Sequence, residues 1–226
     1  MDTYVLRPAM TACDENEPMR LAEKRSSILE RGPLITGIVS TLALTAFSIA
    51  GLGDQLAFDR TTIVAGEFWR LLTGHLTHWN GDHLTWDLLM FAVLGAMIER
   101  RSRWSLIAIV LAAAGSISAA VWLAQPQITQ YRGLSGVDSA LFTYVVAMLL
   151  TDARRSKQSL ATAGILAVVA GFVGKLVWEL STGTTLFVDS AAANFTPLPL
   201  AHVVGGAVGL LTWFAARWTS IRARTS

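Results

Sequence analysis

The sequence predicts an all-α membrane protein, a bundle of six transmembrane helices. Of its 226 residues, 53% are hydrophobic and only 15% are charged, whereas soluble domains average about 25% charged residues. The mean hydropathy is +0.48, an apolar excess larger than one soluble core requires. The net charge of +2 is too small to indicate a nucleic-acid partner, so membrane lipids are the expected surroundings.

Six apolar stretches give the predicted spans. The first runs from Pro33 to about Leu52 without a charged residue and reaches the roughly 20 residues that a bilayer requires. A cleaved signal peptide is the alternative, but the long polar segment before Pro33 favours a retained anchor. The other spans are predicted at about 82–98, 104–124, 134–151, 160–180 and 200–217.

The distribution of basic residues orients these spans. Fourteen of the 18 Lys and Arg residues fall in the tails and loops of one side, whereas the opposite loops hold only Arg60, Arg70 and Arg132. Because basic loops stay in the cytoplasm, both termini are predicted to be cytoplasmic. Residues 1–32 would then form a loosely ordered polar tail, 33–218 the six-span domain, and 219–226 a basic tail.

The first external loop, about 53 to 81, is the longest connection between spans. It contains "GEFWRLLTGHLTHWN", which is apolar and aromatic but includes Arg70 and two histidines. Trp rings are favourable at the boundary between lipid and water. We therefore expect this loop to lie in the membrane interface; a solvated loop with a packed Trp is the alternative.

Polar side chains lie at similar depth in three of the predicted spans. His83 and Asp87 share a helix face near the outer end of the second span. Ser135 begins the fourth span, and His202 lies near the outer start of the sixth. Ionisable groups at this depth are costly unless they face a polar interior or a watery cavity. We therefore expect a convergent polar cluster.

Serine and histidine together suggest nucleophilic chemistry. A hydrogen-bonded imidazole can take the proton of a serine hydroxyl as the serine attacks an acyl carbon. In "GLSG", Gly133 and Gly136 would allow a sharp turn, and free N–H groups at a helix start could bind an oxyanion. This tetrapeptide alone is more often a plain turn. Gly205 and Gly209 would bring the helix of His202 close to its neighbour.

The sequence resembles the rhomboid intramembrane serine proteases over residues 33 to 218. The matching segments are "WRLLT" in the first external loop, "HWNGDHLTWD" entering the second span, "GLSG" opening the fourth and "AHVVGGAVG" in the sixth. Their order and their sides of the membrane also match. The resemblance implies that 33–218 is a catalytic domain in the inner membrane of a bacterium, without a cofactor or a metal.

The resemblance also implies roles for individual residues. Ser135 would be the nucleophile and His202 the general base of a dyad, with no third carboxylate required. His83, Asp87 and Gly133 would serve the oxyanion or orient the dyad. Asp87 stands where the family usually has Asn, and an ionised Asp cannot donate to an oxyanion. Either Asp87 is protonated through burial, or it bonds His83 or His202 and leaves the oxyanion to His83 and the Ser135 amide.

Two longer segments, "WRLLTGHLTHWN" and "YRGLSGVDSALF", resemble the rhombosortase subfamily more closely. That resemblance implies substrates with a transmembrane segment or a C-terminal Gly-Gly sorting signal, cleaved near the outer face. It also implies possible transfer of the cleaved chain to a lipid-linked amine instead of hydrolysis. Because Gly-Gly weakens a helix, it would ease access to the scissile bond.

Three further residues are candidates for the substrate pocket: Asp138, Glu179 and Arg132. Asp138 lies one turn after Ser135 and could pair with a neighbouring helix or shape the pocket. Arg132 directly precedes the glycine of "GLSG" and could bind a lipid phosphate or a substrate carboxylate. Glu179 stands four residues after Lys175, so an ion pair along one helix face is the simplest expectation. Binding of the substrate's exit region or of a lipid amine is the alternative for Glu179.

Three alternatives to the protease remain at this point. A metal enzyme would use His75, His78, His83 and Asp87, although their spacing fits no strong metal template. A non-catalytic rhomboid-like binder of membrane segments would lack the Ser or the His, and here both are present. A transporter would place its acidic residues along a path, whereas here they cluster near the outer end.

Overall fold

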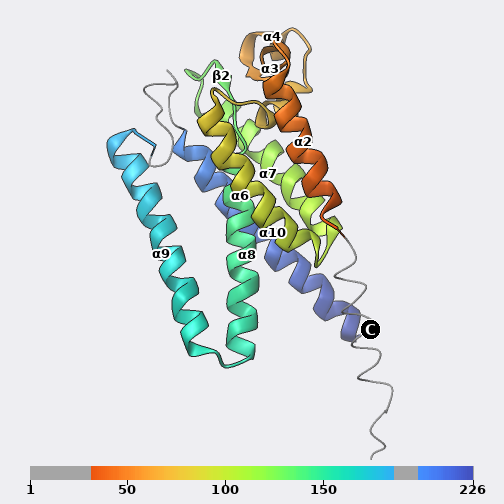
Figure 1. Cartoon of the computed structure of the whole chain (residues 1–226), viewed down its shortest axis with the longest axis vertical. Coiled ribbons are helices and arrows are strands. Elements are labelled where there is room, and N and C mark those ends of the chain that lie inside the picture. Colours follow the sequence, from red (N-terminus) through yellow and green to blue (C-terminus); the bar gives the residue numbers. More distant parts are fainter. Residues whose placement is uncertain (1–31, 186–197, 226) are drawn as a thin grey trace, which may run out of the picture. The chain divides into compact units, whose positions relative to one another are not determined.

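The computed structural model describes residues 32–185 and 198–225. Residues from Pro33 onward belong to one compact unit. Its six helices of 15 or more residues in the described part follow the order of the six predicted spans (Figure 1). They are α2 (Leu34–Ser48), α6 (Gly81–Glu99), α7 (Arg103–Ala124), α8 (Ser135–Arg155), α9 (Ser159–Thr182) and α10 (Pro199–Thr225).

Four of these helices, α7 to α10, are long and apolar enough to cross a membrane. Helix α2 is apolar but only 15 residues long. Helix α6 is not among these four. Its first two turns carry Asp82, His83 and Asp87, and the last two of these, which were predicted as polar residues at this end of the second span, are buried. The apolar helices indicate an integral membrane protein. The start of α6 differs from them in having buried polar side chains.

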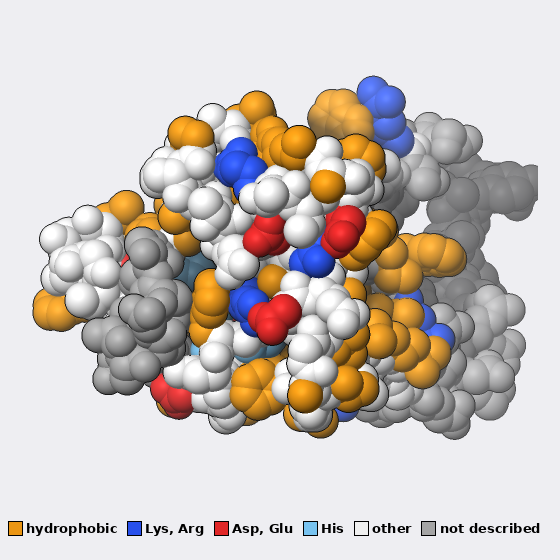
Figure 2. Space-filling view, turned by 90° about the horizontal axis from the view of Figure 1, so that it is seen from above, with side chains coloured by type: hydrophobic (Ala, Val, Ile, Leu, Met, Phe, Trp, Pro, Cys, Tyr) orange, Lys and Arg blue, Asp and Glu red, His pale blue; other side chains and the backbone are white. Residues whose placement is uncertain are grey.

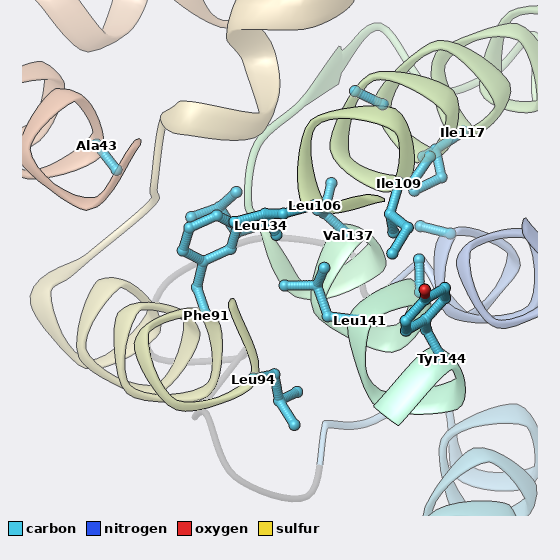
Figure 3. Packing of buried hydrophobic residues seen from close by; sticks show 14 of the residues in the cluster. Ala43, Phe91, Leu94, Leu106, Ile109, Ile117, Leu134, Val137, Leu141 and Tyr144 are labelled. Atoms are coloured by element: carbon cyan, nitrogen blue, oxygen red, sulfur yellow. The ribbon is translucent and has the colours of Figure 1, made fainter. Parts of the chain in front are cut away.

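Helix α8 is the centre of the bundle and contacts α6, α7, α9 and α10. Its inner face packs into the hydrophobic core between α6 and α7 (Figure 3). The core side chains in this region are Leu134, Val137 and Leu141 on the α8 side, Phe91 and Leu94 on α6, and Leu106, Ile109 and Ile117 on α7. This packing fixes the start of α8, where Ser135 lies.

Helices α8 and α10 pack with their backbones in direct contact, as the glycine spacing predicted. A Cβ at Gly205 would overlap the carbonyl oxygen of Gly136, and one at Gly209 would overlap that of Ala140. Thr143 Oγ1 also donates a hydrogen bond across the interface to the carbonyl of Gly206 (2.9 Å). Small residues permit this approach in lipid, and it brings the start of α10 against the start of α8.

The segment between α2 and α6 is folded into short elements. These are α3 (Leu52–Leu56), β1 (Phe58–Asp59), α4 (Arg60–Val64), α5 (Arg70–Thr73) and η1 (Gly74–Leu76). Strand β1 pairs antiparallel with β2 (Gln130–Tyr131), which directly precedes α8. A hydrogen bond from the Gln130 amide is the main cause that lowers the pKa of Asp59. The pairing ties the segment between α2 and α6, the predicted first external loop, to the "GLSG" segment.

Two arginines hold this loop together. Arg60 donates to carbonyls at the end of α7, including those of Val121 and Trp122 at 3.1 Å. Arg70 is buried and donates to the carbonyls of Asp54 (2.7 Å) and Ala57 (2.9 Å). The last four carbonyls of a helix have no partner within the helix, and they therefore provide acceptors for the Arg60 guanidinium at the end of α7.

The same loop exposes large apolar side chains, which an interfacial segment needs. They are Val64, Phe68, Trp69 and Leu72. Its polar residues Arg70 and His75 are turned inward and buried. The exposed apolar surface of this loop suits a position in the membrane interface, which stays a prediction.

Helices begin next to the predicted start of the six-span domain and continue past its predicted end. Helix α10 continues to Thr225, so the predicted basic tail at 219–226 does not begin at a helix end. At the opposite end, the buried carboxylate of Glu99 accepts the N–H groups of Ile35 (2.9 Å) and Thr36 (2.8 Å) and so caps α2. The predicted loose order of the N-terminal tail falls on residues 1–31, outside the described ranges.

Candidate active site

Ser135 and His202 face each other across the contact between α8 and α10. The His202 Nε2 lies 3.1 Å from the Ser135 Oγ. Ser135 is the first residue of α8 and half-buried, and His202 lies in the first turn of α10 and is buried. A hydroxyl at hydrogen-bond distance from an imidazole is the arrangement that nucleophilic catalysis by serine needs.

Glu179 of α9 occupies the other side of the imidazole. Its Oε2 lies 3.0 Å from the His202 Nδ1, and its Oε1 accepts from Lys175 Nζ at 2.6 Å. The predicted ion pair between Lys175 and Glu179 is therefore present. The contact with His202 was not predicted, because sequence spacing relates residues on one helix and cannot relate α9 to α10.

Asp87 lies beneath the start of α8 and accepts several hydrogen bonds. Its Oδ2 accepts the backbone N–H of Leu134 (2.8 Å) and of Ser135 (3.1 Å). The same oxygen lies 3.1 Å from His78 Nε2 and 3.3 Å from His83 Nε2. Of the two predicted partners, Asp87 contacts His83 and not His202. The expectation that the Ser135 amide stands free for an oxyanion differs from this structure, where Asp87 holds it.

His78 belongs to this cluster, although its sequence position suggested only a metal ligand. It is buried, packs edge to face against the ring of His83 with centroids 5.2 Å apart, and reaches Asp87 from the loop before α6. Asn80, which caps α6 by accepting the His83 N–H at 2.8 Å, fixes the turn between these residues. This cap was the available sequence signal for the local turn.

Gly133 has a conformation and a position that only glycine tolerates. Its φ of +123° lies in the region that other residues rarely adopt, and a Cβ there would lie 2.8 Å from the His83 ring. Its carbonyl accepts from the Tyr131 hydroxyl at 3.1 Å. Burial raises the pKa of Tyr131, which keeps this hydroxyl protonated as a donor. Gly133 therefore lets the chain turn tightly over His83 into α8.

The remaining candidates lie around the same hollow. A cavity of about 680 Å³ is lined by Ser135, His202, His83, Asp87, Asp138 and Glu179, together with Arg132 and aromatic side chains that include Trp79, Trp86 and Phe172. Asp138 is buried there, and its Oδ1 has no hydrogen-bond partner among the described residues. The cavity thus combines the predicted polar cluster with an apolar wall.

Arg132 is engaged within the protein at the rim of the cavity. Its Nη2 lies 2.5 Å from Asp54 Oδ1, and its guanidinium lies 4.8 Å from the centre of the Trp79 ring. Figure 2 views this end of the protein and shows acidic and basic side chains next to each other near its middle, with hydrophobic side chains around them. Binding of a substrate carboxylate by Arg132 would have to compete with Asp54.

Unlike His78, the other histidine of this loop that was a candidate metal ligand, His75 makes its hydrogen-bond contacts with α7. Its Nε2–H donates to the carbonyl of Ala114 at 3.1 Å, and Ser118 Oγ lies 3.2 Å away. Burial lowers the pKa of His75 to about 4, so the ring is neutral. Within the described ranges, no group of three or more His, Cys, Asp or Glu side chains has an arrangement that could hold a metal ion.

A comparison with protein families places this geometry in context. Residues 65–219 match the family model of the Rhomboid domain, a segment that extends from the loop before α6 into α10 and contains every residue that lines the cavity. The match covers more than half of the chain, and the apolar helices agree with it. The chain therefore belongs to the rhomboid family, whose members are in general serine proteases that act on membrane proteins within the lipid bilayer.

Proposed function

We propose that this protein is an intramembrane serine endopeptidase with Ser135 as nucleophile and His202 as general base. The observation that carries the proposal is the 3.1 Å approach of His202 Nε2 to Ser135 Oγ inside the cavity. The family match supports a protease. Six spans with both termini in the cytoplasm of a bacterium would place this cavity near the outer face of the inner membrane.

The proposed reaction begins with attack of Ser135 Oγ on the carbonyl carbon of the scissile peptide. The hydroxyl proton moves to His202 Nε2 as the new C–O bond forms, and the carbonyl oxygen becomes an oxyanion. When the C–N bond breaks, His202 returns the proton to the leaving amine. Water then attacks the ester on Ser135, again with His202 as base, and releases the new carboxyl end.

The oxyanion requires hydrogen-bond donors, and one candidate donor, the backbone N–H of Ser135, is already bonded to Asp87 in this structure. The N–H of Ser135 points at the Asp87 carboxylate, so a negatively charged oxygen can use that donor only after Asp87 gives it up. His78 and His83 both lie at the same Asp87 oxygen and can retain the carboxylate as it moves. His83, Asp87 and Gly133 are therefore proposed to shape the oxyanion site rather than to transfer protons.

The proposed substrates are membrane proteins, including proteins with a C-terminal Gly-Gly sorting signal. The basis for Gly-Gly is the resemblance to rhombosortases described above. The apolar wall of the cavity suits a transmembrane segment, and a Gly-Gly pair would favour the unwinding that brings a peptide bond to Ser135. A lipid-linked amine in place of water would convert hydrolysis into transfer.

The test is co-expression with a protein that carries a Gly-Gly tail, followed by mass spectrometry of its C-terminus. Cleavage at the tail that disappears in Ser135→Ala and in His202→Ala supports the protease, and an added mass identifies an amine acceptor. If the tail is removed equally with Ser135→Ala, the proposed nucleophile is wrong. If it is never removed although other membrane segments are cleaved, only the Gly-Gly substrate is wrong.

A further inference from the structure

Helix α9 has an unusual pattern of burial. It is apolar, and many of its large side chains are exposed, including Leu166, Val173, Val177 and Trp178. Among the residues of α9, all of which the structure describes, Glu179 alone is buried, with 2% of its surface exposed. An unpaired carboxylate in such a place would be strongly unfavourable. Its partners must therefore account for its position.

Both carboxylate oxygens of Glu179 have specific partners. One accepts from Lys175 Nζ at 2.6 Å, one turn earlier on the same helix, and the other lies 3.0 Å from His202 Nδ1. A simple ion pair along the helix face would use the first contact alone and would not need burial. The second contact links α9 to the imidazole that faces Ser135.

The contact with Nδ1 determines what the opposite nitrogen of the ring can do. A carboxylate only accepts, so Nδ1 must carry the hydrogen that it receives. In a neutral imidazole, Nε2 then holds the lone pair, and Nε2 is the atom 3.1 Å from Ser135 Oγ. When Nε2 takes the serine proton, the imidazolium that results lies beside a negative charge.

We propose that Glu179 is a positioning residue for His202, so that the site operates as a Ser135–His202–Glu179 triad with Lys175 orienting the carboxylate. The proposal rests on the proposed function and adds a third group to the dyad that the family resemblance implies. Glu179 fixes the tautomer and the ring orientation and stabilises the imidazolium; it takes no proton itself. Lys175 offsets the buried charge and directs the second oxygen toward Nδ1.

The test measures modification of Ser135 by a fluorophosphonate probe at saturating concentrations. The dependence of the labelling rate on probe concentration gives two quantities, the maximal rate of modification and the probe concentration at which the rate is half of that maximum. Glu179→Gln should lower the maximal rate by on the order of 100-fold or more and leave the half-saturating concentration unchanged. Lys175 would hold the amide oxygen and turn the amide NH₂ toward Nδ1, which favours the wrong tautomer.

The double variant Lys175→Met/Glu179→Gln supplies a rescue that a purely structural role would not give. Without the ammonium, the amide is free to flip and present its oxygen to Nδ1, so the maximal rate should partly recover. Glu67→Gln is the matched control, because Glu67 pairs with Arg70 (2.6 Å) in the external loop. Its maximal rate should equal that of the unmodified protein.

A second measurement needs no variant at Glu179. Nitrogen NMR of ¹⁵N-histidine protein, with the His202 signals assigned by their loss in His202→Ala and recorded at a pH at which the His202 ring is neutral, should show Nδ1 protonated and Nε2 unprotonated. The opposite tautomer would overturn the triad.

The labelling experiment separates the triad from the proposed function. A Glu179→Gln variant that reacts at the maximal rate of the unmodified protein would overturn the triad and leave the dyad without Glu179. If His202→Ala also reacts at that rate, the proposed function fails.

Discussion

The Asp87 Oδ2 accepts the backbone N–H of Ser135 at 3.1 Å. An oxyanion on the substrate would need the same N–H, so the carboxylate and the oxyanion compete for one donor. The oxygen of Asp87 also accepts from Leu134 at 2.8 Å, which makes it the acceptor for the free N–H groups at the start of α8. In the proposed reaction, Asp87 must therefore release the Ser135 N–H before an oxyanion can bind it.

Asp87→Asn should increase the maximal rate of Ser135 modification, by about 10-fold or more. The amide keeps an oxygen for the N–H groups of α8 but binds them more weakly than a carboxylate, and it can donate to the oxyanion. The measurement is fluorophosphonate labelling at saturation. Asp152→Asn is the control, because Asp152 pairs with Arg101 at the exposed far end of α8. A slower Asp87→Asn variant would show that the carboxylate assists the reaction.

Gly205→Ala should destabilise the protein by about 1–3 kcal/mol and reduce labelling of Ser135. A Cβ there would overlap the Gly136 carbonyl, so α10 must move away from α8 and take His202 with it. Thermal unfolding in detergent measures the stability. Gly164→Ala is the matched control in a helix, since a Cβ at Gly164 meets nothing within 4 Å. Equal unfolding temperatures for the two variants would contradict the close packing of α8 and α10.

Acidification should destabilise the segment between α2 and α6 through His75. Its pKa in the folded protein is about 4, below the value near 6.5 expected in the unfolded chain. Because the unfolded state binds the proton first, stability falls as the pH drops from about 6.5 toward 4, by no more than roughly 3 kcal/mol. His75→Gln should flatten the dependence of the unfolding temperature on pH in that window. An unchanged pH dependence would assign the acid sensitivity to other groups.

The sequence was sufficient for those features that depend on local pattern. Apolar length predicted the helices, and the spacing of Gly205 and Gly209 predicted the close contact that the structure contains. The similar depth of Ser135 and His202 predicted a convergent cluster, and both now line one cavity. Each of these follows from helical periodicity and from the cost of ionisable groups in lipid.

The missed features depend on contacts between separate helices. Glu179 faces His202 because of the rotation of α9 against α10, which no spacing in the sequence specifies. His78 joins Asp87 because the turn before α6 is capped by Asn80 and folds back on the helix.

The central claim is that His202 activates Ser135, and labelling with a fluorophosphonate probe tests it most directly. We expect mass spectrometry to find the modification on Ser135 and to find none at this position in Ser135→Ala. Labelling should be slower by on the order of 100-fold or more in His202→Ala. Both variants should remain folded, as measured by size-exclusion chromatography. Labelling of Ser135 at the unmodified rate in folded His202→Ala would contradict the account.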